Sequence, residues 1–215
     1  MPVAAKICGI NDPVAMRTAI EGGATHVGLV FYPPSPRAVT PAQAADLAAL
    51  VPDSMSRVGL FVDPTDGEID VVLAETPLEL LQLHGSEAPG RVVEIGSRTG
   101  LKTMKAIPIA SASDFARADG YLQAADWLMF DAKPPKDMTD ALPGGNALSF
   151  DWQLLGGRSW PLPWMLAGGL DAGNVGEAVR LSGAATVDTS SGVEDAKGKK
   201  NPEKIRAFLD AVSSL

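Results

Sequence analysis

Cysteine and histidine are scarce in this sequence. It contains one cysteine, Cys8, and two histidines among 215 residues. A single cysteine excludes an intrachain disulfide and any metal site built from several thiolates. Two histidines beside one cysteine also argue against a zinc centre, which takes three or four such ligands. We therefore expect no metal site.

The chain also lacks an excess of basic residues and any long apolar run. Its 18 Lys and Arg against 26 Asp and Glu give a net charge of −8. Nucleic acid and anionic membranes need a concentrated basic surface, so the charge argues against both as partners. A small anionic ligand stays compatible, because a few local donors suffice to bind it. No stretch has membrane-spanning length and no signal sequence is recognisable, so we expect a cytoplasmic protein.

Short apolar, β-prone runs alternate with alanine-rich, helix-compatible segments along the chain, whose composition is 46% hydrophobic and 20% charged. The runs are AAKICGI, HVGLVFY, RVGLFV, LLQLHG, KTMKAIPI, DWLMFDA, PWMLAGG and ATVDTSSG. The helix-compatible segments include 13–22, 41–50, 66–75, 111–119, 173–181 and 202–213. This alternation predicts βαβ units and a parallel sheet.

Eight such units predict a closed (β/α)₈ TIM barrel that occupies residues 1–215 as a single domain. An open, doubly wound sheet is the rival interpretation. No glycine-rich dinucleotide-binding fingerprint follows the first run, which disfavours that rival.

Two segments interrupt the rhythm. Residues 32–37, YPPSPR, are too proline-rich for regular structure. Residues 132–149 form a segment longer than most connections, and such loops tend to be lids or linkers. Because it lies between a predicted strand and a helix-like pattern, we expect it to be a loop at the carboxyl end of that strand.

Side chains able to do chemistry gather at the carboxyl ends of the predicted strands, which form the active face of a (β/α)₈ barrel. They are Cys8, Arg37, His84, Asp131, Asp188, Ser190 and Ser191. Several also have a structural interpretation. Cys8 fits a small buried hydrophobe, and Asp131 fits a helix cap or a partner of Lys133. His84 fits a structural histidine, and Arg37 fits a surface charge.

Glycine-rich segments close the last two predicted strands. LAGGL contains Gly168 and Gly169, and DTSSGVE contains Ser190, Ser191 and Gly192. Adjacent glycines let a backbone approach an oxyanion, and small hydroxyls with N–H groups complete such a site. Phosphate sites in this fold are commonly built from the loops after strands seven and eight. The two segments together favour phosphate binding over plain turns.

In chain order, the sequence resembles the phosphoribosylanthranilate isomerase family of tryptophan biosynthesis in KICGI, GLVFYPPSPR, LLQLHG, FDAK with PGGNALSFDW, LAGGL and VDTSSGVE…GKK. The resemblance covers essentially the whole chain, and KICG combined with SSGVE is its most specific part. It implies a (β/α)₈ barrel that uses no cofactor. It also implies an Amadori rearrangement of N-(5-phosphoribosyl)anthranilate to 1-(2-carboxyphenylamino)-1-deoxyribulose 5-phosphate. We expect a monomer or a homodimer that binds this small-molecule substrate.

The resemblance also implies roles for individual residues. The general base falls on Cys8 and the general acid on Asp131. Arg37 meets the anthranilate carboxylate, with Asp188 near the anthranilate amine and His84 at the same end. The implied phosphate contacts are Gly168, Gly169, Ser190, Ser191 and Gly192, with Gly144 and Gly145 in the glycine-rich loop after strand six.

Three positions depart from the family pattern. Pro34 stands where the family often has lysine, and the sixth loop reads PGGNALSF rather than GGTGxxF. Asn201 replaces a common acidic residue, but with Pro202 it still predicts the N-cap and first residue of the last helix. The altered sixth loop weakens the expectation of phosphate contacts there.

The two implied catalytic groups ordinarily hold the wrong protonation states. A thiol pKa near 8.5 and an aspartate pKa near 3.9 place the thiolate with a neutral acid roughly 6 kcal/mol uphill. Strand periodicity places Lys6 on the face of Cys8, where its ammonium would stabilise a thiolate. Lys6 equally fits a structural cation paired with Asp188. The substrate carboxylate and an apolar neighbour such as Phe130 would raise the pKa of Asp131.

Two other functions stay open at this stage. A related barrel that isomerises a histidine-pathway phosphoribosyl intermediate usually has an aspartate in place of Cys8. A non-catalytic barrel that binds sugar phosphates would keep the glycine loops without needing Cys8 and Asp131. A turnover assay separates these alternatives.

Overall fold

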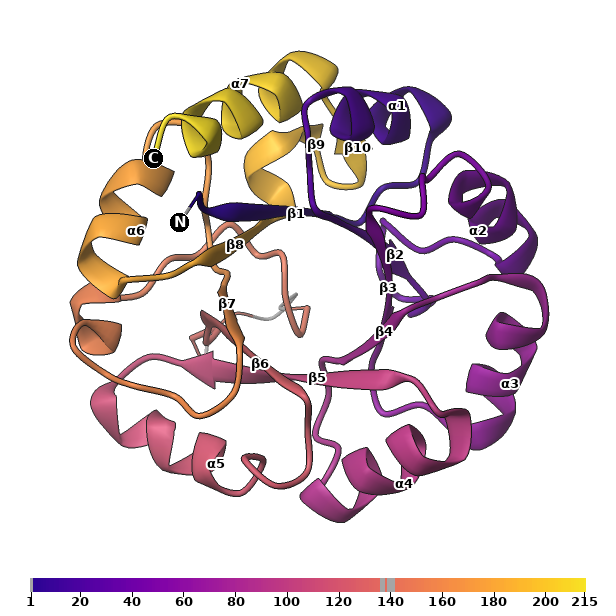
Figure 1. Cartoon of the computed structure of the whole chain (residues 1–215), viewed down its shortest axis with the longest axis horizontal. Coiled ribbons are helices and arrows are strands. Elements are labelled where there is room, and N and C mark those ends of the chain that lie inside the picture. Colours follow the sequence, from indigo (N-terminus) through magenta and orange to yellow (C-terminus); the bar gives the residue numbers. More distant parts are fainter. Residues whose placement is uncertain (1, 136–137, 139–141) are drawn as a thin grey trace.

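A computed structural model describes residues 2–135, 138 and 142–215, and in it eight strands close into a barrel (Figure 1). Neighbouring strands are parallel and follow chain order, and β8 closes the barrel against β1. The strands are β1 (Ala4–Cys8), β2 (His26–Val30), β3 (Ser56–Phe61), β4 (Leu80–Leu83), β5 (Lys102–Ile109), β6 (Trp127–Ala132), β7 (Trp164–Leu166) and β8 (Thr186–Thr189). The predicted (β/α)₈ barrel is confirmed, and the open-sheet alternative is wrong.

Helices surround the barrel and begin at signals that are readable in the sequence (Figure 1). Asp12 accepts hydrogen bonds from two backbone N–H groups of the first helical turn, and Asn201 does the same before Pro202. These side chains satisfy backbone donors that a helix start leaves unpaired. The helices are α1 (Pro13–Glu21), α2 (Pro41–Ala48), α3 (Asp66–Glu75), α4 (Pro89–Thr99), α5 (Ala116–Asp119), α6 (Val175–Ser182) and α7 (Pro202–Ser213).

Four local features differ from, or were absent from, the sequence prediction. Helix α4 was missed because two glycines interrupt its pattern, although Val92 and Ile95 bury one face. The predicted helix at 111–119 is a 3₁₀ turn followed by the short α5. The helix expected after residue 149 is a single 3₁₀ turn, Trp152–Leu155, which the glycines at 156 and 157 end. A hairpin of β9 (Glu194–Ala196) and β10 (Lys199–Lys200) was not predicted.

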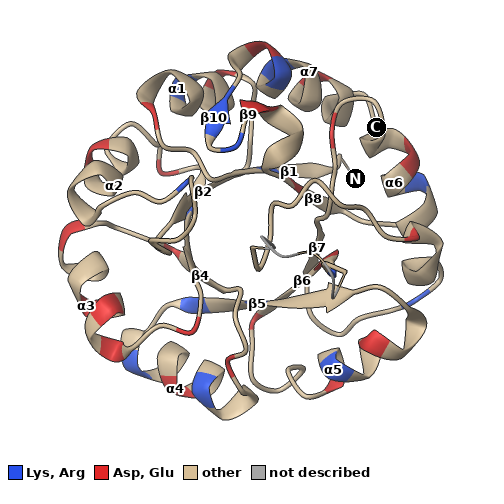
Figure 2. Ribbon diagram, turned by 180° about the vertical axis from the view of Figure 1, so that it is seen from behind, with Lys and Arg blue, Asp and Glu red and all other residues tan. Residues whose placement is uncertain are grey.

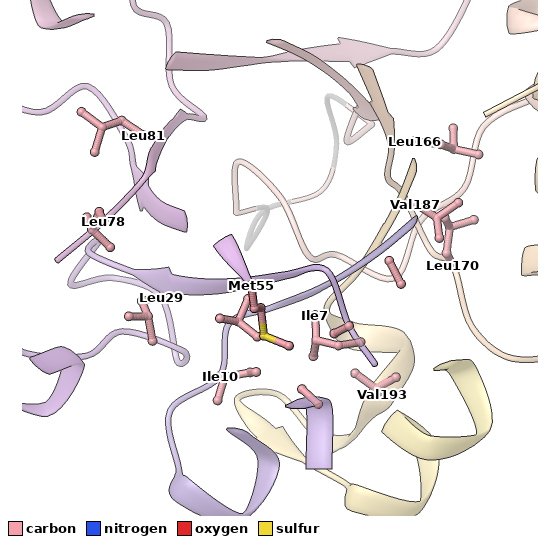
Figure 3. Packing of buried hydrophobic residues seen from close by; sticks show 14 of the residues in the cluster. Ile7, Ile10, Leu29, Met55, Leu78, Leu81, Leu166, Leu170, Val187 and Val193 are labelled. Atoms are coloured by element: carbon pink, nitrogen blue, oxygen red, sulfur yellow. The ribbon is translucent and has the colours of Figure 1, made fainter. Parts of the chain in front are cut away.

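The main hydrophobic core lies between the barrel and its helices, where Ile7, Leu29, Leu81 and Val187 are fully buried (Figure 3). A second cluster fills the inside of the barrel, with Val58, Leu80, Met104, Ala106, Met129, Met165 and Ala167. Because side chains alternate along a strand, the residues two places after Leu80 and Met129 also point inward. These are Gln82 and Asp131, nearer the carboxyl ends of their strands.

Charged residues lie mainly on the outer helices and on the β9–β10 hairpin (Figure 2). Among the described residues, none of the helices combines the length and apolar character needed to cross a membrane.

Candidate active site

A pocket opens at the carboxyl ends of the strands, on the face where the sequence predicts the site. Ten of the eleven residues predicted to contact or transform the substrate line it, together with Gln82 and Gly144. The ten are Cys8, Arg37, His84, Asp131, Gly145, Gly168, Gly169, Asp188, Ser190 and Ser191. Gly192 is not among the lining residues. It packs against the Leu170 carbonyl oxygen so closely that a side chain there would collide with it.

Cys8 ends β1 and is almost completely buried beside Lys6. The fully buried Lys6 Nζ lies 2.8 Å from Asp188 Oδ1. Burial disfavours the Lys6 ammonium, but the negative charges of Asp188 and Cys8 outweigh burial and raise the pKa of Lys6. Lys6 therefore remains a cation inside the barrel. It combines the two roles that the sequence left open, because it pairs with Asp188 and faces the thiol.

The thiol of Cys8 does not become more acidic in this surrounding. Burial raises the pKa of Cys8, and the charge of Lys6 offsets only part of the rise, since Asp188 opposes it. Lys6 therefore lowers the pKa of Cys8 by less than burial raises it. In the free protein Cys8 is a thiol at neutral pH.

Asp131 is the penultimate residue of β6 and faces His84 in the pocket. Its Oδ1 accepts a hydrogen bond of 2.8 Å from the Ala132 N–H, and its Oδ2 lies 3.2 Å from His84 Nε2. Lys133, the alternative partner considered from the sequence, pairs instead with Asp114 at 2.8 Å. Asp131 is thus neither a helix cap nor a partner of Lys133. It lines the pocket.

Arg37 is buried rather than a surface charge, and Glu194 holds it. Arg37 Nε and Nη2 donate to the two Glu194 carboxylate oxygens at 2.7 and 2.9 Å, which is a bidentate pair. Nη2 also donates to the Gly145 carbonyl at 3.1 Å. Within the described residues Nη1 makes no hydrogen bond, so this nitrogen remains available to a ligand. Gly145 lines the pocket beside Arg37, and its predicted phosphate contact stays a prediction.

Sequence reasoning missed Glu194 and Lys200, which the β9–β10 hairpin brings under the site. Lys200 Nζ donates to Glu194 Oε1 at 2.8 Å and to the Ser190 carbonyl at 2.9 Å. Ser190 Oγ in turn donates to the Cys8 carbonyl at 3.1 Å. Hydrogen bonds to Arg37 and the charge of Lys200 outweigh burial and lower the pKa of Glu194. The signal in the sequence that could have indicated this pair is the segment VEDAKGKK, in which an acidic residue after an apolar one is followed by lysines.

The glycine pairs predicted to bind phosphate have the backbone that such a site needs. Gly168 and Gly169 have φ of +93° and +63°, in the region that favours glycine. A Cβ on Gly168 would lie 2.8 Å from the Ala132 nitrogen. The backbone of β7 therefore approaches β6 closely, and the turn exposes backbone beside Ser190 and Ser191 in the pocket. The predicted loop 132–149 includes residues 136–137 and 139–141, which lie outside the described residues, so a lid there stays a prediction.

Replacing Gly168 by alanine tests this close approach, and Gly157→Ala is the matched control. Gly157 has φ +71° and open space around it, so its substitution adds backbone strain alone, about 1–2 kcal/mol. Gly168→Ala adds a collision with β6, and we expect at least about 1 kcal/mol more loss in the free energy of unfolding. Urea unfolding measures both losses. Equal losses would show that β6 shifts away from the added methyl group without lowering the free energy of unfolding.

Comparison with known proteins identifies the family of this chain. A family model described as N-(5′phosphoribosyl)anthranilate (PRA) isomerase matches residues 5–211. The N-(5′-phosphoribosyl)anthranilate isomerase of Paramagnetospirillum magneticum is 59% identical over 211 residues, which are 98% of this chain and 97% of that protein.

Solved structures agree over nearly the whole chain. Phosphoribosyl anthranilate isomerase from Thermotoga maritima has a TM-score of 0.88 at 33% identity, covering 99% of this chain and 100% of that one. A phosphoribosyl anthranilate isomerase in complex with reduced 1-(o-carboxyphenylamino)-1-deoxyribulose 5-phosphate has a TM-score of 0.83 at 31% identity, with the same coverage. Because the family match runs from the first strand to the last helix, this chain belongs to the N-(5′-phosphoribosyl)anthranilate isomerase family.

Proposed function

We propose that this chain catalyses the Amadori rearrangement of N-(5-phosphoribosyl)anthranilate to 1-(2-carboxyphenylamino)-1-deoxyribulose 5-phosphate, a step of tryptophan biosynthesis. One observation carries the proposal: Cys8 from β1 and Asp131 from β6 line the same pocket. The reaction requires an acid at the ring oxygen and a base at the neighbouring carbon. Two groups from different strands meet both requirements.

Asp131 supplies the acid in the first step. Its carboxylic acid gives a proton to the furanose ring oxygen while the bond from that oxygen to C1′ breaks. The nitrogen lone pair of the anthranilate forms the C1′=N bond, so the ring-opened substrate is a protonated Schiff base. This intermediate takes up the electrons released in the next step, and the enzyme's own residues need only move protons.

Cys8 supplies the base in the second step. Its thiolate removes the proton from C2′, and the electrons of that C–H bond form the C1′=C2′ bond as the Schiff base becomes an enolamine. The enol then loses its hydroxyl proton and C1′ gains one, which gives the ketone. Lys6 stays charged beside the thiol and stabilises the thiolate state that burial disfavours.

Groups around the pocket bind the two ends of the substrate. Arg37 Nη1 meets the anthranilate carboxylate, and Glu194 keeps the guanidinium in place. Gly168, Gly169 and Ser191 form the phosphate end. Ser190 supports this end by joining Cys8 to Lys200. Gly192 supports it by bringing the loop after β8 against the loop after β7.

Direct turnover of N-(5-phosphoribosyl)anthranilate by the purified chain tests the function. The substrate is an anthranilate derivative, so its disappearance is followed by ultraviolet absorbance or fluorescence. Turnover that depends on the chain supports the proposal. A chain that binds inorganic phosphate in the pocket but leaves this substrate unchanged is a sugar-phosphate-binding barrel, and the proposal fails.

Arg37→Lys is expected to weaken binding of anthranilate-bearing ligands by at least about tenfold while the affinity for inorganic phosphate stays unchanged. A guanidinium binds Glu194 with two nitrogens and still has a third for the ligand, whereas a lysine ammonium cannot reproduce this geometry. Isothermal titration with reduced product analogue and with phosphate measures the two affinities separately. If both affinities fall together, Arg37 belongs to the phosphate end or to the scaffold.

We further propose that the chain is one domain and works in the cytoplasm as a monomer or a homodimer. The single-domain proposal rests on barrel closure, because β1 pairs with β8 and α7 packs on α1 and β1. Separating the first and last parts of the chain would open the barrel.

A further inference from the structure

A buried amide lies beneath the pair formed by His84 and Asp131. Gln82 is completely buried inside the barrel, two residues before His84 on the same face. Its Nε2 lies 2.8 Å from His84 Nδ1 and 3.3 Å from Met129 Sδ. Within the described residues its Oε1 is buried without a hydrogen-bond partner. A buried amide with one unpaired oxygen is costly, so a role is expected for the bonds that it does make.

The neighbours of Gln82 fix which end of its amide faces the histidine. The thioether sulfur of Met129 accepts hydrogen bonds but cannot donate them, so the group beside it is the NH₂. The same NH₂ faces His84 Nδ1. An amide nitrogen has no acceptor capacity, hence Nδ1 is the acceptor and carries no proton. The proton of a neutral His84 is then on Nε2, 3.2 Å from Asp131 Oδ2.

We propose that Gln82 is a positioning residue for the acid–base chemistry, because it holds His84 as a neutral imidazole that donates from Nε2 to Asp131. The inference rests on the proposed role of Asp131 as the general acid. An imidazolium at this distance would stabilise the Asp131 carboxylate over the carboxylic acid that ring opening needs. The acid would then lose its proton too readily. The Gln82 N–H occupies the lone pair that a second proton on His84 needs, so the imidazolium is disfavoured.

Other charged groups around this corner are already paired. On β5, Lys105 Nζ lies 2.7 Å from Glu87 Oε2 in the loop after β4. On the far wall of the pocket Lys6 pairs with Asp188, and Arg37 and Lys200 share Glu194. Cys8 is a thiol whose pKa burial raises. Asp131 is therefore the carboxylate that a charge on His84 affects most directly.

The two histidines make the protonation of His84 directly observable. Long-range ¹H–¹⁵N correlation spectra of the ¹⁵N-histidine-labelled chain contain two imidazole rings, and a His26→Gln variant assigns them. Burial and the charge of Lys6 lower the pKa of His26 to about 4, so His26 stays neutral above pH 5. We expect His84 to be the Nε2–H tautomer from pH 6 to pH 8. A proton on Nδ1 in this range overturns the proposal, whatever the turnover of the enzyme.

Two substitutions of Gln82 separate proton control from packing. In Gln82→Glu the carboxylate accepts a hydrogen bond from Nδ1–H, so the spectra should show both His84 nitrogens protonated at pH 7. Gln82→Met keeps the length and burial of the side chain but removes the N–H donor, so Nδ1 should no longer be held without a proton and its N–H signal should increase at pH 7. Circular dichroism and urea unfolding confirm that both variants are folded before they are compared.

The pH profile of kcat provides the second readout. The acidic limb of the bell-shaped profile is a macroscopic value of the acid–base pair, and a positive charge on His84 would move it. Gln82→Glu should move this limb at least one unit towards lower pH and lower the plateau at least tenfold. Gln82→Met removes the donor without adding a charge, so it should move the limb in the same direction by less and lower the plateau by less. If both variants shift the limb equally, or neither does, Gln82 only packs. Loss of turnover in the unmodified chain would instead overturn the proposed function, while the spectra still decide the tautomer.

Discussion

Asp131→Asn is expected to lower kcat by several orders of magnitude while substrate affinity stays close to that of the unmodified chain. An amide has no proton to transfer at any accessible pH, so ring opening loses its acid. Because both Asp131 oxygens accept hydrogen bonds, the amide NH₂ must face either the Ala132 N–H or the His84 Nε2–H. One unpaired donor adds about 1–3 kcal/mol of lost stability. Single-turnover kinetics measures the chemical step, and urea unfolding measures the stability.

Asp114→Asn is the matched control for a lost carboxylate. Asp114 accepts from two backbone N–H groups and pairs with Lys133, and although burial opposes them, these bonds lower its pKa to about 2. It does not line the pocket, so its amide variant should lose stability and keep its turnover. An Asp131→Asn chain that turns over within tenfold of the unmodified one would move the acid elsewhere, with Asp188 the next candidate.

Cys8→Ala is expected to lower kcat at least about 10²-fold, the contribution of a positioned general base. Alanine replaces a buried side chain of similar size, and the Ser190 hydrogen bond to residue 8 uses the main chain and survives. Folding should therefore be largely intact. Steady-state turnover with a thermal unfolding curve gives both quantities. An alanine variant at nearly full rate would restore the interpretation of Cys8 as a buried hydrophobe.

The state of the thiol has its own readout, because Cys8 is the only cysteine. Its pKa is raised, so the thiolate fraction at neutral pH is smaller than that of an unfolded cysteine. The rate of alkylation by iodoacetamide should rise about tenfold per pH unit until the pH exceeds the ordinary thiol value near 8.5. A plateau at neutral pH would mean that Lys6 outweighs burial.

The barrel was predictable because its strands are short apolar runs between helix-compatible segments. Strands of a parallel sheet are buried on both faces, so their residues are apolar almost throughout. Helix α4 escaped because its signal depends on two buried residues, whereas the glycines at 90 and 96 weaken helix propensity. The position of the pocket followed from the fold. The hydrogen-bond partners within the pocket did not follow from it. Arg37 and Glu194 are 157 residues apart, and neither residue alone indicates that it pairs with the other.

The state of Lys6 shows the same limit. Strand periodicity placed it on the face of Cys8, but two roles remained. Only the register of β1 against β8, which sets Lys6 opposite Asp188, showed that one ammonium serves both. The direction of the Cys8 pKa was also out of reach, since it depends on how completely the surrounding strands exclude water.

Closure of the barrel between β1 and β8 has a consequence for synthesis on the ribosome. Lys6 emerges before its counter-charge Asp188, which follows 182 residues later in the chain. At about 5–20 residues per second, the lysine waits on the order of ten seconds or more for its partner. A buried, unpaired ammonium is strongly unfavourable, so β1 stays hydrated in the nascent chain. Lys6 thus becomes buried when the pocket is completed. The side of the pocket formed by β1 and β8 exists only after β8 has been synthesised.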